Sequence, residues 1–92
     1  MNIARLKNFT EIVKNNFNIS ATAEKLYTSQ PTLSKQMKML EDELGLALFT
    51  RKGKNLVGLT SAGEKVMELA KGVVAQVEQL NQLSLGEQLA TS

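Results

Sequence analysis

The chain has 92 residues, of which 42% are hydrophobic, and this length fits one small domain held together by packing alone. It contains no cysteine and no histidine, which excludes disulfides, thiolate or imidazole metal sites and the commonest catalytic bases. The net charge of +2 is uneven: residues 1–60 carry nine Lys/Arg against five Asp/Glu, and residues 61–92 carry two Lys against four Glu.

These properties favour a binding protein over an enzyme. Without a histidine, a cysteine or a convergent pair of carboxylates, we expect no catalytic residue, no metal and no cofactor. No apolar run approaches the length of a membrane span, and the N-terminus lacks the pattern of a signal peptide. We therefore expect a cytoplasmic protein without a membrane partner.

The first predicted element is a helix within residues 2–17, followed by a turn at residues 15–18. Its apolar residues recur at three- and four-residue steps, as one stripe of a helix does: Ile3, Leu6, Phe9, Ile12, Val13 and Phe17. Ser20 is a good N-cap for a second, short helix that Tyr27 closes.

The third predicted helix begins near residue 30 and ends at about Leu44. Proline is tolerated only in a first turn, so Pro31 fixes the start, with Thr28 or Ser29 as the cap. Gly45 stands where a left-handed C-cap is expected. At 100° per residue, one face carries Leu33, Met37, Leu40 and Leu44, and a roughly opposite face carries Pro31, Ser34, Lys35 and Lys38.

A hairpin and a long helix complete the chain. Residues 46–51 and 55–59 are short apolar segments joined by Lys52-Gly53-Lys54, which predicts a two-stranded hairpin with a basic tip. Thr60 then caps a helix over residues 60–84, and residues 85–92 are expected to be a hinge or a frayed end. A heptad seam for pairing with a second copy runs through Val66, Ala70, Val73, Val77 and Leu80.

This order of elements predicts a mainly α fold, a winged helix-turn-helix over residues 1–59 followed by a linker or dimerisation helix. Periodicity alone equally fits a third helix whose polar face is merely solvated. However, residues 30–40 lack acidic side chains, and Glu41 or Asp42 is placed to pair with Lys38. The surface therefore favours the major groove of double-stranded DNA as its partner.

The residues divide by the chemistry that each can offer to DNA. For reading bases we predict Gln30, Pro31, Thr32, Ser34 and Lys35, of which Gln30 suits adenine and Lys35 suits guanine. For phosphates we predict Thr28, Ser29, Lys38, Lys52 and Lys54. Arg51 is the candidate for insertion into the minor groove, although the wing cations also fit a purely solubilising role.

Several segments, taken in order, resemble the N-terminal DNA-binding domain of LysR-type transcriptional regulators, which are bacterial transcription factors. The resemblance covers residues 3–83 and rests on Ala21–Leu26, Thr28–Gln36, Leu40–Gly45, Leu48–Arg51 and Leu59–Gly63. The Tyr27–Pro31 and Met39–Gly45 segments are most similar to the branch that controls sulfur assimilation and cysteine synthesis.

The resemblance implies sequence-specific DNA binding, with the third helix in the major groove, the wing along the minor groove and a homodimer formed through the linker helix. It also implies a C-terminal domain beyond Ser92 that binds a small-molecule inducer, and a tetramer in the full-length protein. Lys35 stands where the family often has arginine, which weakens a forked guanine contact, and Thr32 stands where many members have proline or alanine. The alternatives are a winged-helix repressor of another family and a winged-helix module that binds protein.

Overall fold

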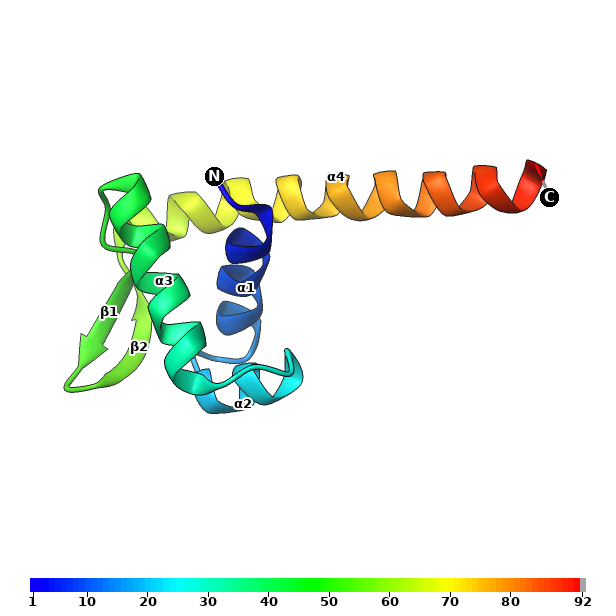
Figure 1. Cartoon of the computed structure of the whole chain (residues 1–92). Coiled ribbons are helices and arrows are strands. Elements are labelled where there is room, and N and C mark those ends of the chain that lie inside the picture. Colours follow the sequence, from blue (N-terminus) through cyan, green and yellow to red (C-terminus); the bar gives the residue numbers. More distant parts are fainter. Residues whose placement is uncertain (92) are drawn as a thin grey trace.

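The computed structural model describes the backbone of residues 1–91 and the side chains of residues 1–87. Its elements follow the predicted order (Figure 1): α1 (Ile3–Lys14), α2 (Ile19–Lys25), α3 (Gln30–Leu44), β1 (Phe49–Lys52), β2 (Asn55–Leu59) and α4 (Ser61–Thr91). The predicted fold is confirmed: three helices and a two-stranded wing are followed by a long helix that projects from the domain.

The turn between α1 and α2 corrects the predicted cap of the second helix. Asn18 is the N-cap, because its Oδ1 accepts a hydrogen bond from the backbone N–H of Ala21 at 2.9 Å. Asparagine caps helices as well as serine does, and here it stands two residues before Ser20. The Ser20 hydroxyl, within the first turn of α2, is therefore free for another contact.

The bounds of α3 match the prediction, and local chemistry sets both. Ser29 is the N-cap and accepts from the N–H of Thr32 at 3.2 Å, while Pro31 occupies the first turn. Gly45 ends the helix in the left-handed conformation, with φ of 67°. The N–H groups of Gly45 and Leu46 then donate back to the carbonyls of Asp42 and Glu41, which closes the helix.

The hairpin forms as predicted around Gly53, whose φ of 62° suits a tight turn. The strands are antiparallel with Phe49 opposite Leu59 and Lys52 opposite Asn55, and the register shifts between Thr50 and Arg51. The first strand is shorter than the apolar segment at residues 46–51, because the residues just after Gly45 still complete the end of α3.

One core joins the helices to the wing. The fully buried side chains include Phe9 and Ile12 of α1, three residues of α3, and Leu48 just before β1. The ring of Phe49 lies 5.4 Å from that of Phe9 and 6.4 Å from that of Phe17, centroid to centroid. The first residue of the wing is therefore fixed by aromatic contacts to α1 and the turn after it.

The start of α4 is capped and tightly packed. The hydroxyl of Thr60 accepts from the N–H of Gly63 at 2.9 Å, as the predicted cap requires. A Cβ atom at Gly63 would collide with the carbonyl oxygen of Leu48, so only glycine lets α4 lie this close to the chain before β1. The far end of α4 passes residue 84, where we had predicted it to end, and continues to Thr91. No proline interrupts residues 85–91, and Gly86 alone is a weak helix breaker.

The predicted seam of α4 is rotated in the structure. Ala70 is only 1% exposed and belongs to the core with Met67, so it is not available to a second copy; the prediction for Ala70 is wrong. The reason is that α4 packs on α1, and this packing buries the residues along one edge of the predicted seam. Val66 and Val77 are half-buried beside that edge. The exposed stripe, hereafter the α4 stripe, consists of Leu69, Val73, Leu80 and Leu83.

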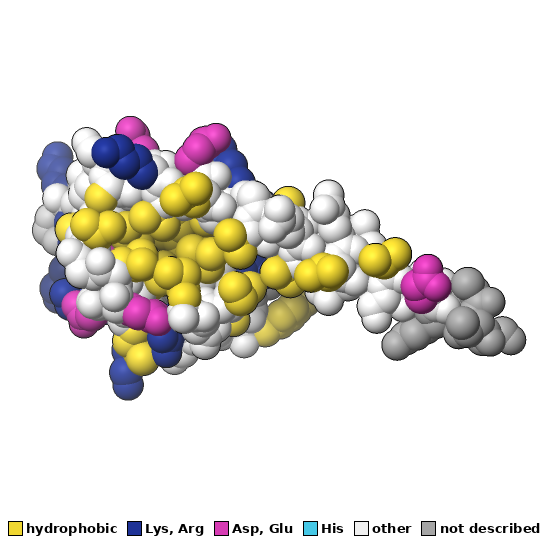
Figure 2. Space-filling model, turned by 90° about the horizontal axis from the view of Figure 1, so that it is seen from above, with side chains coloured by type: hydrophobic (Ala, Val, Ile, Leu, Met, Phe, Trp, Pro, Cys, Tyr) yellow, Lys and Arg dark blue, Asp and Glu magenta, His cyan; other side chains and the backbone are white. Residues whose placement is uncertain are grey.

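Figure 2 views the molecule from the α4 side and shows hydrophobic side chains over the body of the domain and along the projecting helix. Leu69 and Leu80 are 74% and 64% exposed, and with Val73 and Leu83 they form an exposed apolar stripe on one side of α4. The spacing of the α4 stripe remains that of a heptad pattern.

The packing at Gly63 generates a stability prediction with an internal control. Replacing Gly63 by alanine should destabilise the domain by about 1–3 kcal/mol, because the methyl group forces α4 away from Leu48. Gly72 is also within α4 but is exposed with open space around it, so Gly72→Ala should stabilise by about 0.5–1 kcal/mol. Urea denaturation of both variants measures the difference, and equal shifts of the same sign would contradict this packing.

Candidate nucleic-acid interface

The predicted base-reading residues form one exposed surface on α3. Gln30, Pro31, Thr32, Ser34 and Lys35 are all exposed, as is Lys38. The back of the same helix is fully buried through Leu33, Met37 and Leu40. Because the back of α3 is buried and this face is exposed, these polar side chains lie outside the core and face solvent.

The residues at the start of α3 are less free than predicted. The Ser29 hydroxyl accepts from the Thr32 N–H and donates to the Thr32 hydroxyl at 2.8 Å. Thr28 is half-buried, and its N–H donates to the carbonyl of Ala23. Ser29 therefore has a capping role in addition to the phosphate contact predicted for it.

A contact between α2 and α3 was missed in the sequence. The Ser20 hydroxyl donates a hydrogen bond of 2.7 Å to Oε1 of Gln30, and both side chains lie at the surface. Ten residues separate the two positions, so no helical periodicity connects them. Nothing in the sequence indicates it, because the Ser20 hydroxyl is expected there to cap α2, and only the structure shows that Asn18 takes that role.

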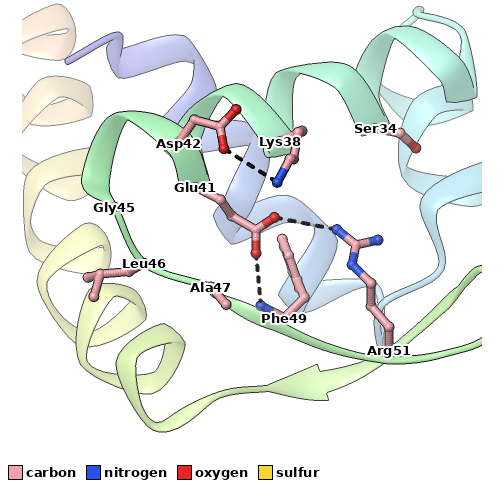
Figure 3. Close-up of a pocket in the computed structure, with 9 residues that line it drawn as sticks. All are labelled: Ser34, Lys38, Glu41, Asp42, Gly45, Leu46, Ala47, Phe49 and Arg51. Carbon is pink, nitrogen blue, oxygen red and sulfur yellow. Dashed lines mark hydrogen bonds and ion pairs between the residues drawn. The ribbon is translucent and has the colours of Figure 1, made fainter.

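Glu41 connects α3 to the wing, as Figure 3 shows. Its side chain is only 9% exposed, and Oε2 accepts from the N–H groups of Leu48 at 2.8 Å and Phe49 at 3.5 Å. Its other oxygen lies 3.4 Å from Nη2 of Arg51. A buried carboxylate with these partners fixes where β1 starts and holds the guanidinium beside the α3 surface.

The pairing predicted for Lys38 is therefore made by Asp42 and not by Glu41. Lys38 Nζ lies 3.4 Å from Asp42 Oδ1, with both side chains more than half exposed, so the pair adds little stability. These groups line an open hollow of about 880 Å³ between α3 and β1, drawn in Figure 3. Within residues 1–87, Lys35, Lys52 and Lys54 form no ion pair with an acidic side chain.

The tip of the hairpin and the N-terminal end of α3 point away from α4 (Figure 1). A second hollow, of about 310 Å³, brings residues of both together, since Gln30 lines it with Lys54 and Asn55 of the wing. A helix with an exposed polar face can enter the major groove of a duplex, and a basic hairpin beside it can follow the backbone.

These features define a winged helix-turn-helix protein of the class that recognises nucleic acid. Residues 3–64 match the family of bacterial regulatory helix-turn-helix proteins called the lysR family, and the chain belongs to this family. The chain is 42% identical to the HTH-type transcriptional regulator CysB of Haemophilus influenzae over 78 residues, which are 85% of the chain and 24% of the relative. It is 43% identical to the regulator SsuR of Burkholderia cenocepacia over 84 residues, which are 91% of the chain and 27% of that relative.

Solved structures share the fold over almost the whole chain. Full-length OxyR from Pseudomonas aeruginosa has a TM-score of 0.85 at 34% identity and covers 94% of this chain and 28% of its own. The CbnR_DBD–DNA complex has a TM-score of 0.81 at 30% identity, and the match covers 95% of this chain and 98% of the CbnR chain. The chain thus spans about a quarter of the relatives CysB and SsuR and nearly all of the isolated CbnR domain.

Two further findings concern the described residues as a whole. None of their helices is long and apolar enough to cross a membrane. No group of three or more acidic, cysteine or histidine side chains among them is arranged to hold a metal ion.

The contacts of Glu41 predict that two neighbouring acidic residues differ sharply in their effect on stability. Glu41→Ala should destabilise by about 1–3 kcal/mol, because the buried N–H of Leu48 loses its acceptor and Arg51 loses its partner. Asp42→Ala removes only an exposed pair and should change the free energy of unfolding by less than about 0.5 kcal/mol. Chemical denaturation compares them, and similar losses would show that Glu41 does not anchor the wing.

Proposed function

We propose that this chain is the sequence-specific, double-stranded-DNA-binding domain of a LysR-type transcriptional regulator that acts in the bacterial cytoplasm. Its function is binding and not catalysis. The observation that carries the proposal is the exposed surface of α3 from Gln30 to Lys38, which lacks acidic side chains and lies beside a basic wing. The family membership and the DNA complex of the similar CbnR domain support it.

In this proposal α3 enters the major groove and the wing follows the adjacent backbone. Gln30, Ser34 and Lys35 offer hydrogen-bonding groups to base edges, while Pro31 and Thr32 offer apolar contact to thymine methyl groups. The phosphate contacts come from the residues predicted for them: Thr28, Ser29, Lys38, Lys52 and Lys54. Arg51 reaches the minor groove from β1, with Glu41 limiting where its guanidinium can go.

We further propose that the genes controlled belong to sulfur assimilation and cysteine synthesis. The residues of the Tyr27–Pro31 and Met39–Gly45 segments support this branch, as does the identity of 42% to the regulator named CysB. Inducer binding and tetramer formation are assigned to the remainder of a full-length regulator, since CysB and SsuR are about four times as long as the part matched.

The domain acts as a dimer in this proposal, joined through α4. The α4 stripe leaves four large apolar side chains exposed at heptad spacing, and covering them with the same stripe of a second copy removes that surface from water. A two-fold pair of domains would place two α3 helices on the two halves of a partly palindromic site.

Alanine variants on α3 and the wing should separate base reading from phosphate contact. Gln30→Ala and Lys35→Ala should each lower the ratio of operator to random-DNA affinity by roughly tenfold, because each loses contacts to base edges. Lys54→Ala should weaken both affinities alike and reduce their dependence on salt. Fluorescence titrations at several salt concentrations measure these effects, and an unchanged specificity ratio in Gln30→Ala would refute its role as a base reader.

A gel-shift with promoter DNA separates DNA binding from the remaining alternative, a module that binds protein. The proposal predicts a shifted band that weakens as the salt concentration rises. Absence of any salt-sensitive band would favour the protein-binding module. Membership of the lysR family already excludes the winged-helix repressor of another family.

The dimer is tested by adding one charge to the α4 stripe. Val73→Glu should convert the dimer to a monomer in analytical ultracentrifugation without unfolding it, since Val73 is 36% exposed. Gln82→Glu adds the same charge at an exposed position on the opposite side of α4 and should leave the dimer intact. A dimer that survives Val73→Glu would refute pairing through this stripe.

A further inference from the structure

The hydrogen bond between Ser20 and Gln30 restricts a side chain that the proposed function uses to read DNA. Ser20 Oγ donates to Gln30 Oε1 at 2.7 Å, and both residues are exposed. Gln30 also lines the 310 Å³ hollow with Ser20 and the wing residue Lys54. The amide group is thus held at the meeting point of α2, α3 and the wing, although no core packing holds it.

The contact makes the two ends of the Gln30 amide unequal. Its oxygen faces Ser20 and accepts one hydrogen bond from the hydroxyl, whereas the described residues supply no hydrogen-bond acceptor for Nε2. An amide nitrogen carries two donor hydrogens, and an amide can present either its donors or its acceptor according to its orientation. While the oxygen faces Ser20, the donors are what the amide offers to a partner.

We propose that Ser20 is a specificity-determining residue, which orients the Gln30 amide so that it acts as a hydrogen-bond donor toward the base it faces. The inference rests on the proposed function and adds the chemical class of base that Gln30 selects. Ser20 acts through Gln30 and needs no contact with DNA itself.

The major-groove edges of the bases give this orientation a definite consequence. Guanine offers N7 and O6 as acceptors, adenine offers N7 and thymine offers O4, whereas cytosine offers only the N4 donor. Opposite cytosine, the amide donors of Gln30 would meet another donor and both would lose hydrogen bonds with water. The pair should therefore accept guanine, adenine or thymine and reject cytosine by roughly tenfold in affinity.

The test uses the dimeric domain and four duplexes that differ at one base pair. The position is the one at which Gln30→Ala reduces discrimination in a scan of single-base variants of the operator. The parent should bind the cytosine duplex roughly tenfold more weakly than the best of the other three. In Ser20→Ala the amide can turn and accept from cytosine N4, so this penalty should fall to about twofold or less.

Two further variants separate positioning from general damage. Ser20→Thr keeps the hydroxyl and should restore rejection of cytosine. The double variant Ser20→Ala/Gln30→Ala should discriminate among the four duplexes as well as Gln30→Ala alone does. Without the Gln30 amide, Ser20 has no side chain to orient. Random-DNA affinity and the midpoint of thermal unfolding should be unchanged in Ser20→Ala, since both partners are exposed.

The inference is overturned if the parent and Ser20→Ala rank the four bases alike, or if Ser20→Thr behaves as the alanine variant does. Both outcomes leave DNA binding by the parent intact, so they refute only the role of Ser20. A parent that binds operator and random DNA equally, or a Gln30→Ala variant that loses no discrimination anywhere, overturns the base-reading function and the inference together.

Discussion

Burial of Leu33, Met37 and Leu40 fixes the rotation of α3 about its own axis, and every candidate contact with DNA depends on that rotation. The three side chains are 0%, 1% and 0% exposed in a core shared with α1 and α2. Because successive residues turn by 100° in a helix, fixing the back of α3 also fixes where its front residues lie. A rotation by one residue, or 100°, would turn leucine and methionine out of the core and carry polar side chains into it.

The wing depends on the same helix through one side chain. Glu41 lies at the edge of the buried face of α3, and it accepts hydrogen bonds from the chain that leads into β1. The rings of Phe9 and Phe17 hold Phe49 from the other side. Two grooves of a duplex can be contacted together only if the elements that enter them keep a fixed separation. The carboxylate and the aromatic cluster provide that restraint on the wing.

Sequence alone predicted the features that local chemistry decides. Pro31 and Gly45 set the ends of α3 because their backbone preferences hold in any tertiary setting. The hairpin around Gly53 and the cap at Thr60 follow from the same kind of reasoning. Together with the helical period, these local rules place the candidate recognition residues on a face of α3 that the structure shows to be exposed.

The features that escaped prediction all depend on which segments meet in space. Glu41 and Asp42 were equal candidates for pairing with Lys38, because nothing near Glu41 in sequence shows that β1 returns across its side chain. Ala70 fits a heptad seam equally well whether α1 or a second copy covers it, and only the packing of α4 on α1 decides. The contact between Ser20 and Gln30 likewise depends on how α2 and α3 are placed relative to each other, which the sequence does not show.

In vitro selection of bound duplexes from a random DNA pool tests the central claim most directly, because it requires no assumption about the operator. The account predicts enrichment of a partly palindromic motif with two half-sites, one for each α3 of a dimer. Enrichment should disappear in a variant with alanine at Gln30, Ser34 and Lys35 together. Recovery of sequences with no shared motif from the parent domain would contradict sequence-specific recognition by α3.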